Sequence, residues 1–356
     1  MRYGLLLLGE HSPERLLNLA QFAEEHDFEN LWYADEKFYR DPYVGLTYVS
    51  QHTSRIKLGT CVTDPYTRHP ALTAMAMGTL AELAGGRAVL GIGAGFSGLQ
   101  AMGLKQPKPP VALREAVELI RQLWAGGTVT YQGETVAFHG GELNFKSRPD
   151  IPVLIATSGR QILRLAGEMA DGMMLGDMAS ARVIVPALAE VRRGAERAGR
   201  SLAGVPLIAR ANLILSDDPA EARKPMQPWI AISLWYTYPK WDYYFNYTPE
   251  WDERLRPIKE FIERQGDKPR NVGDFNLIAE YADLIGDDLV RDAALAGTVD
   301  DVVKQIVEVA VAGITQITLY PMPLPGQTIE TVLETFVKNV APAVEAALSG
   351  PLPSSR

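Results

Sequence analysis

The sequence predicts a (β/α)8 barrel, an α/β fold in which eight parallel strands are each followed by a helix. Short apolar runs of strand length alternate with longer segments of helical period along the 356 residues. These runs are nearly continuous rather than alternating, which is typical of parallel strands covered on both faces. Eight such units of similar size favour a closed barrel over a doubly wound sheet, which rarely uses so many.

The individual elements follow from this pattern. The first helix has the clearest start, because Ser12 is a good N-cap residue and Pro13 suits the first helical position. The expected strands cover residues 3–8, 29–34, 56–62, 87–92, 152–156, 171–175, 206–214 and 316–321. The expected helices cover residues 13–27, 42–54, 70–84, 111–125, 159–169, 180–198, 299–312 and 327–347.

Two segments interrupt the alternation within what we expect to be one domain, residues 1–350. Residues 128–142 contain two alternating runs around Gln132–Gly133, which indicates a small inserted hairpin. Residues 225–290, between strands seven and eight, are too long for one barrel helix and are rich in Trp and Tyr. This TIM-barrel insertion is either a substrate lid or an aromatic interface or mini-core, and the sequence leaves both open.

The overall composition excludes several classes of function. A formal net charge of −8 argues against a nucleic-acid or anionic-membrane partner. The single cysteine, Cys61, allows no intramolecular disulfide and no cysteine-based metal cluster, and no pair of the five histidines has helical ligand spacing. The apolar run Leu5–Leu8 is too short for a signal peptide or a membrane span. We therefore expect a cytoplasmic protein without a metal that acts on a small molecule.

Two adjacent acids follow the second expected strand, where loops at the carboxyl ends of barrel strands form one mouth. Asp35 and Glu36 point opposite ways in an extended segment, so at most one enters this mouth. Either is a candidate proton donor or acceptor if it is partly desolvated. The alternative is that they pair with Lys37 or Arg40 on the rim.

The loop after strand four is rich in glycine. Residues 93–98 satisfy the G-x-G-x-x-G pattern and follow a strand, but they do not open a helix, and no acid ends a second strand at the required distance. A dinucleotide fingerprint is therefore a poor interpretation. The loop is either a place where the backbone closely approaches a flat ring or a plain turn.

Residues 157–161 lie at a strand-to-helix turn. Free backbone N–H groups and the helix dipole favour an anion there, and Ser158, Gly159 and Arg160 suit a phosphate. The alternative is an ordinary helix start with a solvated arginine.

Five stretches of the chain resemble the methylenetetrahydromethanopterin reductases, a deazaflavin-dependent branch of the luciferase-like superfamily. They are residues 31–35, 61–70, 85–95, 155–172 and 297–302. The resemblance implies a homodimer of (β/α)8 barrels with coenzyme F420 lying across the mouth. It also implies a cis peptide at Cys61–Val62, where the family usually has Gly in place of Cys61, and it places Asp35 near the ring. The family phosphate site maps onto Ser158 and Gly159. The coenzyme contacts that we expect are Thr60, Cys61, Val62, Thr63, Gly93, Ala94, Gly95, Ser158, Gly159 and Arg160.

Three departures from this family concern the substrate rather than the coenzyme. Glu36 stands where relatives carry His, Leu6 where the reductases carry an acid, and Phe96 where they often carry Asp. We therefore expect hydride transfer between F420 and an organic substrate that differs from that of the reductases. Asp35 or Glu36, with Glu36 preferred, would handle the accompanying proton, and Tyr66 and Arg68 on the next loop would orient the substrate.

Two rival functions remain at this point. An FMN-dependent luciferase-like monooxygenase would use the same barrel mouth. A barrel that has lost its chemistry and only binds a ligand or a partner is mildly supported by Leu6.

Overall fold

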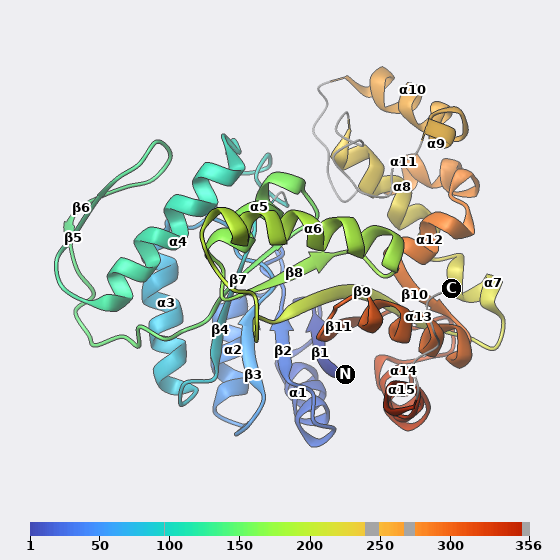
Figure 1. The fold of residues 1–356 in the computed structure, drawn as a ribbon, viewed down its shortest axis with the longest axis horizontal. Coiled ribbons are helices and arrows are strands. Elements are labelled where there is room, and N and C mark those ends of the chain that lie inside the picture. Colours follow the sequence, from blue (N-terminus) through green and yellow to red (C-terminus); the bar gives the residue numbers. More distant parts are fainter. Residues whose placement is uncertain (96, 239–248, 267–274, 351–356) are drawn as a thin grey trace.

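The computed structural model describes residues 1–95, 97–238, 249–266 and 275–350. Its main sheet consists of parallel strands and closes on itself, because the eighth barrel strand pairs with both the seventh and the first (Figure 1). The predicted barrel is thereby confirmed. Around the barrel the strands are β1 (Arg2–Leu7), β2 (Asn30–Tyr33), β3 (Lys57–Thr60), β4 (Ala88–Ile92), β7 (Val153–Thr157), β8 (Gly172–Gly176), β9 (Leu207–Leu215) and β11 (Gln316–Pro321).

Helices cover the outside of the barrel, and several begin at the residues that the sequence indicates. The Ser12 side chain accepts a hydrogen bond from the Arg15 N–H at the start of the first helix, and the Asp41 side chain does the same for Tyr43 and Val44 at the second. The barrel helices are α1 (Pro13–Glu25), α2 (Pro42–Ser50), α3 (Pro70–Leu83), α4 (Pro109–Ala125), α5 (Arg160–Met169), α6 (Ala181–Arg197) and α13 (Val299–Val311). The chain then forms α14 (Ile329–Thr335), the π-helical turn η4 (Phe336–Val340) and α15 (Ala341–Ser349).

The interior of the barrel is filled with side chains and leaves no channel below the mouth. Trp32 is fully buried there, and Gly59 on β3 makes room for it, because a Cβ at Gly59 would lie 2.3 Å from the Trp32 ring. A functional site in the barrel must therefore lie above this layer, at the carboxyl ends of the strands. The interior cluster consists of Leu6, Trp32, Ala34, Val89, Leu154, Met174 and Ile208.

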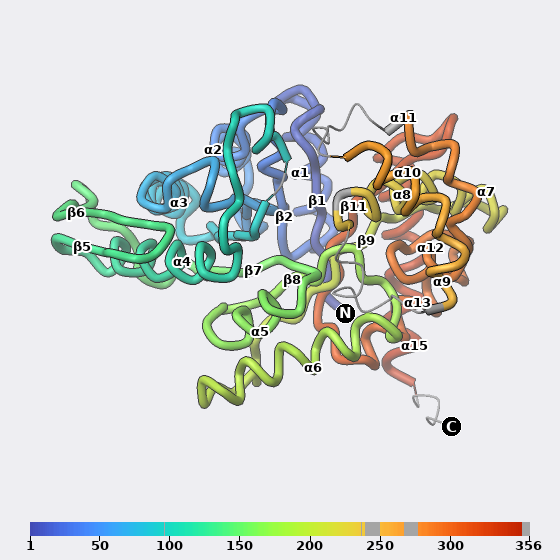
Figure 2. The backbone as a smooth tube through the Cα atoms, turned by 90° about the horizontal axis from the view of Figure 1, so that it is seen from above, coloured from blue at the N-terminus to red at the C-terminus, as the bar shows by residue number. Residues whose placement is uncertain are grey.

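A two-stranded antiparallel hairpin, β5 (Val129–Gln132) and β6 (Ala137–Gly141), lies between β4 and β7 in sequence. Figure 2 shows it extending beyond α4 at one edge of the molecule. The buried Glu115 side chain on α4 anchors the turn, because it accepts hydrogen bonds from three consecutive backbone N–H groups, those of residues 134–136.

A group of helices separates β9 from β11 and stands apart from the barrel helices in Figure 1. It has its own apolar core, in which Trp235 and Trp251 are buried, whereas Trp229 is 40% exposed. Most of the aromatic run in the sequence, residues 241–247, lies outside the described residues. The elements are α7 (Pro219–Arg223), α8 (Met226–Thr237), α9 (Pro249–Arg254), α10 (Arg256–Gln265), α11 (Phe275–Ile278), the 3-10 helix η3 (Ala279–Leu284) and α12 (Asp287–Ala293).

A short strand after these helices was not expected from the sequence. β10 (Ala294–Gly297) pairs in parallel with the second half of β9, while the first half of β9 pairs with β8 on the same side. The four residues of β10 follow α12 directly, and no turn-forming residue marks the boundary between them. The sequence therefore does not indicate that a strand begins there.

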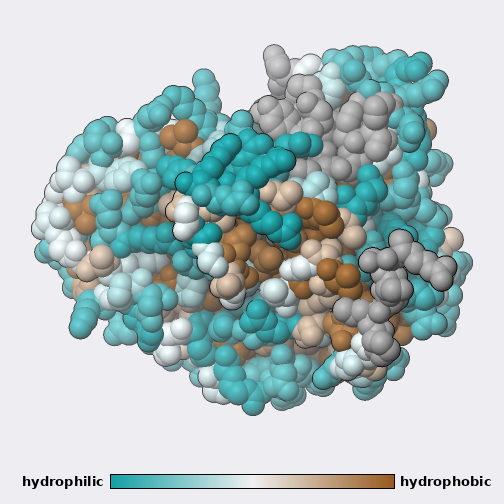
Figure 3. All heavy atoms as spheres, in the orientation of Figure 1, coloured by the Kyte–Doolittle hydropathy of each residue, from teal (hydrophilic) through white to brown (hydrophobic). Residues whose placement is uncertain are grey.

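Hydrophilic residues gather over α5 and α6 on the face shown in Figure 3. Within the described ranges, no helix combines the length and apolar character needed to cross a membrane. The same residues contain no group of three or more His, Cys, Asp or Glu side chains able to hold a metal ion.

Candidate active site

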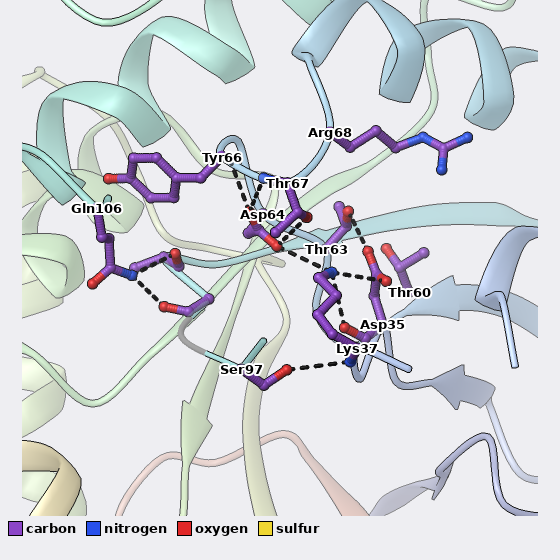
Figure 4. Close-up of polar contacts among 12 residues, drawn as sticks. Asp35, Lys37, Thr60, Thr63, Asp64, Tyr66, Thr67, Arg68, Ser97 and Gln106 are labelled. Carbon is purple, nitrogen blue, oxygen red and sulfur yellow. Dashed lines mark hydrogen bonds and ion pairs between the residues drawn. The ribbon is translucent and has the colours of Figure 1, made fainter. Parts of the chain in front are cut away.

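A lysine and two carboxylates form a compact cluster at the mouth of the barrel (Figure 4). The Lys37 Nζ lies 2.9 Å from the Asp35 Oδ1 and 3.1 Å from the Asp64 Oδ2. Thr63 donates its hydroxyl hydrogen to the Asp35 Oδ2 at 2.8 Å and accepts the hydroxyl hydrogen of Tyr43. The side chains of all three charged residues are nearly buried, so each charge depends on its protein partners rather than on water.

Asp64 also determines the shape of the loop that joins β3 to α3. Its side chain accepts hydrogen bonds from the backbone N–H groups of Tyr66 and Thr67 and from the Thr67 hydroxyl, all at 2.7–2.8 Å. An aspartate that bonds the backbone two and three residues ahead is a common turn-forming arrangement. The ion pair with Lys37 thus connects the β2 loop to the β3 loop.

The glycine-rich loop after β4 packs directly on this cluster. A Cβ at Gly95 would lie 2.6 Å from the Asp64 Cβ, and one at Gly98 would lie 2.4 Å from the Lys37 Cβ. Both glycines also have positive φ, 63° and 66°, which other residues rarely adopt. Gln106 donates to the Ala94 carbonyl at 2.7 Å and holds the loop from the other side. The two glycines thus serve close packing on Asp64 and Lys37, in keeping with our expectation that this loop is not a dinucleotide-binding fingerprint. Phe96 lies outside the described residues.

Glu36 differs from its neighbour Asp35 in having no ion pair among the described residues. Burial raises the pKa of Glu36 and Asp35 adds to this, while the hydrogen bond with Ser97 and the charge of Lys37 oppose it. Ser97 also accepts a hydrogen bond from the Lys37 N–H. A carboxyl group with a raised pKa at a barrel mouth is suited to hold and release a proton.

The ends of β3 and β4 lie side by side, as the sequence predicts. The Cys61–Val62 peptide is cis. The Thr63 N–H donates to the Gly91 carbonyl, and the Gly93 N–H donates to the Thr63 carbonyl at 2.9 Å. Burial raises the pKa of the Cys61 thiol to about 12, so this cysteine is a neutral packing group. The Thr60 side chain is fully buried and bonds the Gly91 carbonyl, which leaves its backbone as the part nearest the mouth.

The turn between β7 and α5 has an open helix start. Gly159 is the N-cap residue of α5, no side chain caps this start, and a Cβ at Gly159 would meet only the Thr157 hydroxyl, at 3.7 Å. Ser158 lies beside it, half-buried. Arg160 is near Glu190, whose pKa is lowered mainly by the hydrogen bond from Arg164, with smaller effects of Arg193 and Arg160.

Tyr66 and Arg68 lie on the expected loop but do not join the acid–lysine cluster. The Tyr66 hydroxyl donates to the Pro107 carbonyl at 2.9 Å. The Arg68 guanidinium lies 4.3 Å from the centre of the Tyr43 ring and points away from Lys37 in Figure 4. Both side chains therefore support neighbouring segments in this structure.

Sequence reasoning missed two groups of residues at the mouth. Lys37 was considered only as a rim partner, and Asp64 was given no role, because their contact joins loops 27 positions apart. Arg210 and Tyr320 were hidden inside apolar runs expected to be strands seven and eight. Their residue types could have identified them, since a charged or phenolic side chain inside an apolar strand needs a polar partner or a ligand.

Comparisons with known proteins agree with this geometry. Residues 1–316 match the family model described as luciferase-like monooxygenase. A 5,10-methylenetetrahydromethanopterin reductase from Archaeoglobus fulgidus is 32% identical over 318 residues, which are 89% of this chain and 92% of that protein. An F420-dependent glucose-6-phosphate dehydrogenase from Kineococcus radiotolerans is 32% identical over 242 residues, which are 63% of this chain and 71% of that protein.

Among solved structures, the coenzyme F420 dependent tetrahydromethanopterin reductase from Methanopyrus kandleri has a TM-score of 0.80 and 28% identity, covering 96% of this chain and 98% of that chain. The match extends over nearly the whole length of both chains. With the family model matching most of its length, this chain belongs to the luciferase-like monooxygenase family.

Proposed function

We propose that this protein is an oxidoreductase that transfers a hydride between coenzyme F420 and an organic substrate at the mouth of its barrel. The observation that carries the proposal is the close packing of the β3 and β4 ends at Val62 and Gly93, together with Glu36, a partly buried acid with a raised pKa that follows the neighbouring strand β2. The relatives named above support it, because one is named an F420-dependent dehydrogenase and another a coenzyme F420 dependent reductase.

The residues present fit a deazaflavin with a phosphate-bearing tail. A Cβ at Gly93 would lie 2.8 Å from the Val62 Cγ2 and 3.0 Å from the Ala156 carbonyl oxygen, so glycine lets the end of β4 pack closely against β3 and β7. In this proposal the flat ring lies against that closely packed wall. The Gly159 N–H donates to the Thr157 hydroxyl, so the backbone N–H groups that the uncapped start of α5 offers to a phosphate are those that follow Gly159. When bound, the coenzyme supplies a carrier of two electrons and a proton as hydride, with little use for O₂.

The protein's own groups then have separate tasks in this proposal. Thr60 to Thr63 and Gly93 to Gly95 shape the ring wall, and Ser158, Gly159 and Arg160 hold the phosphate. Glu36 holds the proton that accompanies the hydride, because burial raises its pKa and so favours the protonated carboxyl. Asp35 is occupied by Lys37 and Thr63, so it positions the loop rather than exchanging a proton.

Tyr66 and Arg68 act in this proposal through the loops that they hold. Tyr66 ties the β3 loop to Pro107, and Arg68 covers Tyr43, whose hydroxyl bonds Thr63. Both therefore position the substrate side of the mouth without contacting the reacting atoms.

The decisive experiment titrates the purified protein with F420 and, separately, with FMN while the coenzyme absorbance is recorded. The proposal expects tight F420 binding and reversible bleaching of the deazaflavin band when a substrate panel is added without oxygen. A preference for FMN together with substrate-dependent O₂ consumption would establish the monooxygenase alternative instead. Binding of F420 with no turnover on the full panel would favour a barrel that has lost its chemistry.

We also propose that the protein is a cytoplasmic homodimer that pairs through α2 and α3. Exposed apolar side chains form one stripe on each of these adjacent helices, at the spacing of a single helix face. The stripe consists of Val44 and Tyr48 on α2 and Leu72, Met75 and Leu83 on α3. Light scattering should report a dimer for the parent and a monomer for Met75→Glu. The control Val311→Glu changes a more exposed apolar residue on α13 and should remain dimeric.

A further inference from the structure

Two polar side chains emerge from the interior faces of β9 and β11. Ile208 belongs to the barrel interior, whereas Ala209 and Ala211 belong to the outer core, so Arg210 faces inward one layer above Ile208. On β11, Leu319 faces outward and Tyr320 packs against the interior cluster. Both residues therefore lie at the upper edge of the filled interior, where the mouth begins.

The order of strands places this pair across the mouth from the proposed coenzyme wall. Around the closed barrel, β9 is four strands from β3 and β11 is four strands from β4. In an eight-stranded barrel, strands four apart are diametrically opposed. Arg210 thus faces the end of β3 at Cys61, and Tyr320 faces the end of β4 at Gly93.

The guanidinium of Arg210 has donors to spare. Among the residues that the structure describes, it donates only to Asp177, through one of its five N–H groups. Its carbon lies 5.5 Å from the centre of the Tyr320 ring, and the Tyr320 hydroxyl has no protein hydrogen-bond partner in the described part of the chain. Gly176, the neighbour of Arg210 in the β8–β9 register, has nothing within 4 Å of an added Cβ. The mouth therefore has open space beside Arg210, at the end of β8.

Electrostatic coupling shows that these groups share one space with the rest of the mouth. Burial raises the pKa of Tyr320 to about 12; Glu10 and Glu36 add to this, and Arg210 opposes it. Arg210 also opposes the burial that raises the pKa of Cys61 on the far wall. A single cation thus influences both walls.

We propose that Arg210 and Tyr320 anchor the substrate through an anionic oxygen group, a carboxylate or a phosphate, on the wall opposite the coenzyme. This inference rests on the proposed function and adds to it the substrate class. Asp177 holds the guanidinium in place until the substrate arrives, and the Tyr320 hydroxyl donates to the same oxygen group or to the carbonyl beside it.

The magnitudes favour exchange of Asp177 for a ligand. The Asp177 side chain is 54% exposed, and such ion pairs contribute only about 0–1 kcal/mol. A planar guanidinium binding a desolvated carboxylate or phosphate in a two-point contact makes much stronger bonds. An anion that enters the mouth therefore competes well with Asp177, whereas a neutral alcohol does not.

The test uses the F420-loaded protein and follows the deazaflavin absorbance during titration with acetate, inorganic phosphate and the neutral probe acetone. Arg210→Met should raise the dissociation constants of both anions about tenfold or more and leave that of acetone unchanged. Tyr320→Phe should raise them by a smaller factor. The control Arg223→Met removes a comparable arginine–aspartate pair, with Asp287, away from the mouth and should change nothing.

The outcomes separate this inference from the proposed function. If the parent binds F420 and Arg210→Met and Tyr320→Phe bind both anions as well as the parent, the anchor is wrong while the function stands. If Arg210→Met weakens F420 itself as much as the anions, Arg210 serves the coenzyme's own acidic tail and the substrate assignment fails. If the parent binds no F420, the proposed function fails first. Thermal unfolding of each variant shows whether it is folded. If Arg210→Met is unfolded, the anion affinity of Tyr320→Phe tests the anchor instead.

Discussion

The two walls of the barrel mouth differ in how their charges are satisfied. On the β2–β4 wall, Lys37 is held between Asp35 and Asp64, and Asp64 accepts three further hydrogen bonds from its own loop. On the β9–β11 wall, within the described residues, Arg210 pairs only with the half-exposed Asp177 and lies over the Tyr320 ring. The first wall is completed by the protein itself, whereas the second offers donors that a ligand can complete.

This difference has a physical basis in burial. A nearly buried carboxylate such as Asp64 must find its partners within the fold, because an unpaired charge there is costly. A side chain at the open edge of the mouth can rely on water until a ligand replaces it. Glu36 lies between these cases, since it is partly buried and has no ion pair within the part of the chain that the structure describes, and burial raises its pKa.

The largest expected effect concerns Glu36. Glu36→Gln keeps the shape of the side chain and removes its proton exchange, so turnover should fall by roughly 10²–10⁴-fold with F420 affinity nearly unchanged. The control Glu10→Gln removes another acid near Tyr320, one for which we propose no proton role, and should keep near-parental turnover. Steady-state rates beside coenzyme titrations provide the measurement. Near-parental turnover of Glu36→Gln would place the proton elsewhere.

The pH dependence of turnover should follow the raised pKa of Glu36. When the substrate is reduced, the protonated carboxyl is required, so the rate should fall about tenfold per pH unit above that pKa. When the substrate is oxidised, the carboxylate is required and the rate should rise through the same pKa. The free energy of unfolding should also decrease as pH rises, because a group whose pKa is raised in the folded state loses its stabilising contribution as pH rises through that pKa. If the pH–rate profile of Glu36→Gln were the same as that of the parent, Glu36 would not be the group that exchanges the proton.

The next effect concerns the paired wall. Lys37→Met leaves Asp35 and Asp64 facing each other without a cation, and it should lower the free energy of unfolding by about 3 kcal/mol. The control Lys57→Met breaks a more exposed pair with Glu29 and should cost at most about 1 kcal/mol. Denaturant unfolding at neutral pH measures both. If both variants lost the same free energy of unfolding, the Lys37 cluster would stabilise the protein no more than a surface ion pair does.

Gly159 tests the phosphate end of the coenzyme wall. Gly159→Glu places bulk and negative charge at the uncapped start of α5, and it should raise the dissociation constant of F420 about tenfold or more. Gln161→Glu adds the same charge at an exposed position two residues later and should have a clearly smaller effect. If both variants bind F420 like the parent, the phosphate lies elsewhere.

The smallest expected effect concerns one hydrogen bond behind the paired wall. Tyr43→Phe removes the hydroxyl that donates to Thr63 at 3.1 Å, and it should destabilise the protein by about 1 kcal/mol. Tyr39→Phe, at a residue 45% exposed, should leave stability unchanged. A shift of the thermal midpoint in both variants, or in neither, would remove the special role of the Tyr43–Thr63 contact.

Much of the fold was predictable because it depends on local sequence. The eight apolar runs, the Ser12 start of α1 and the position of the glycine-rich loop after β4 are all signals within a few residues. The short strand β10 was not, because four small residues after α12 have no local preference for a strand and are fixed only by pairing with β9.

Periodicity and strand ends are local properties, so the sequence predicts the barrel, the ends of β3, β4 and β7 as neighbours at one mouth, and two acids after β2. Which acid is paired depends on the folded barrel: Lys37 reaches Asp35 and Asp64 at once, and Glu36 has no ion pair among the described residues. It also turned Arg210 inward, opposite β3. Charge pairing and burial depend on distances through space between loops far apart in the chain, and those distances exist only once the barrel has closed.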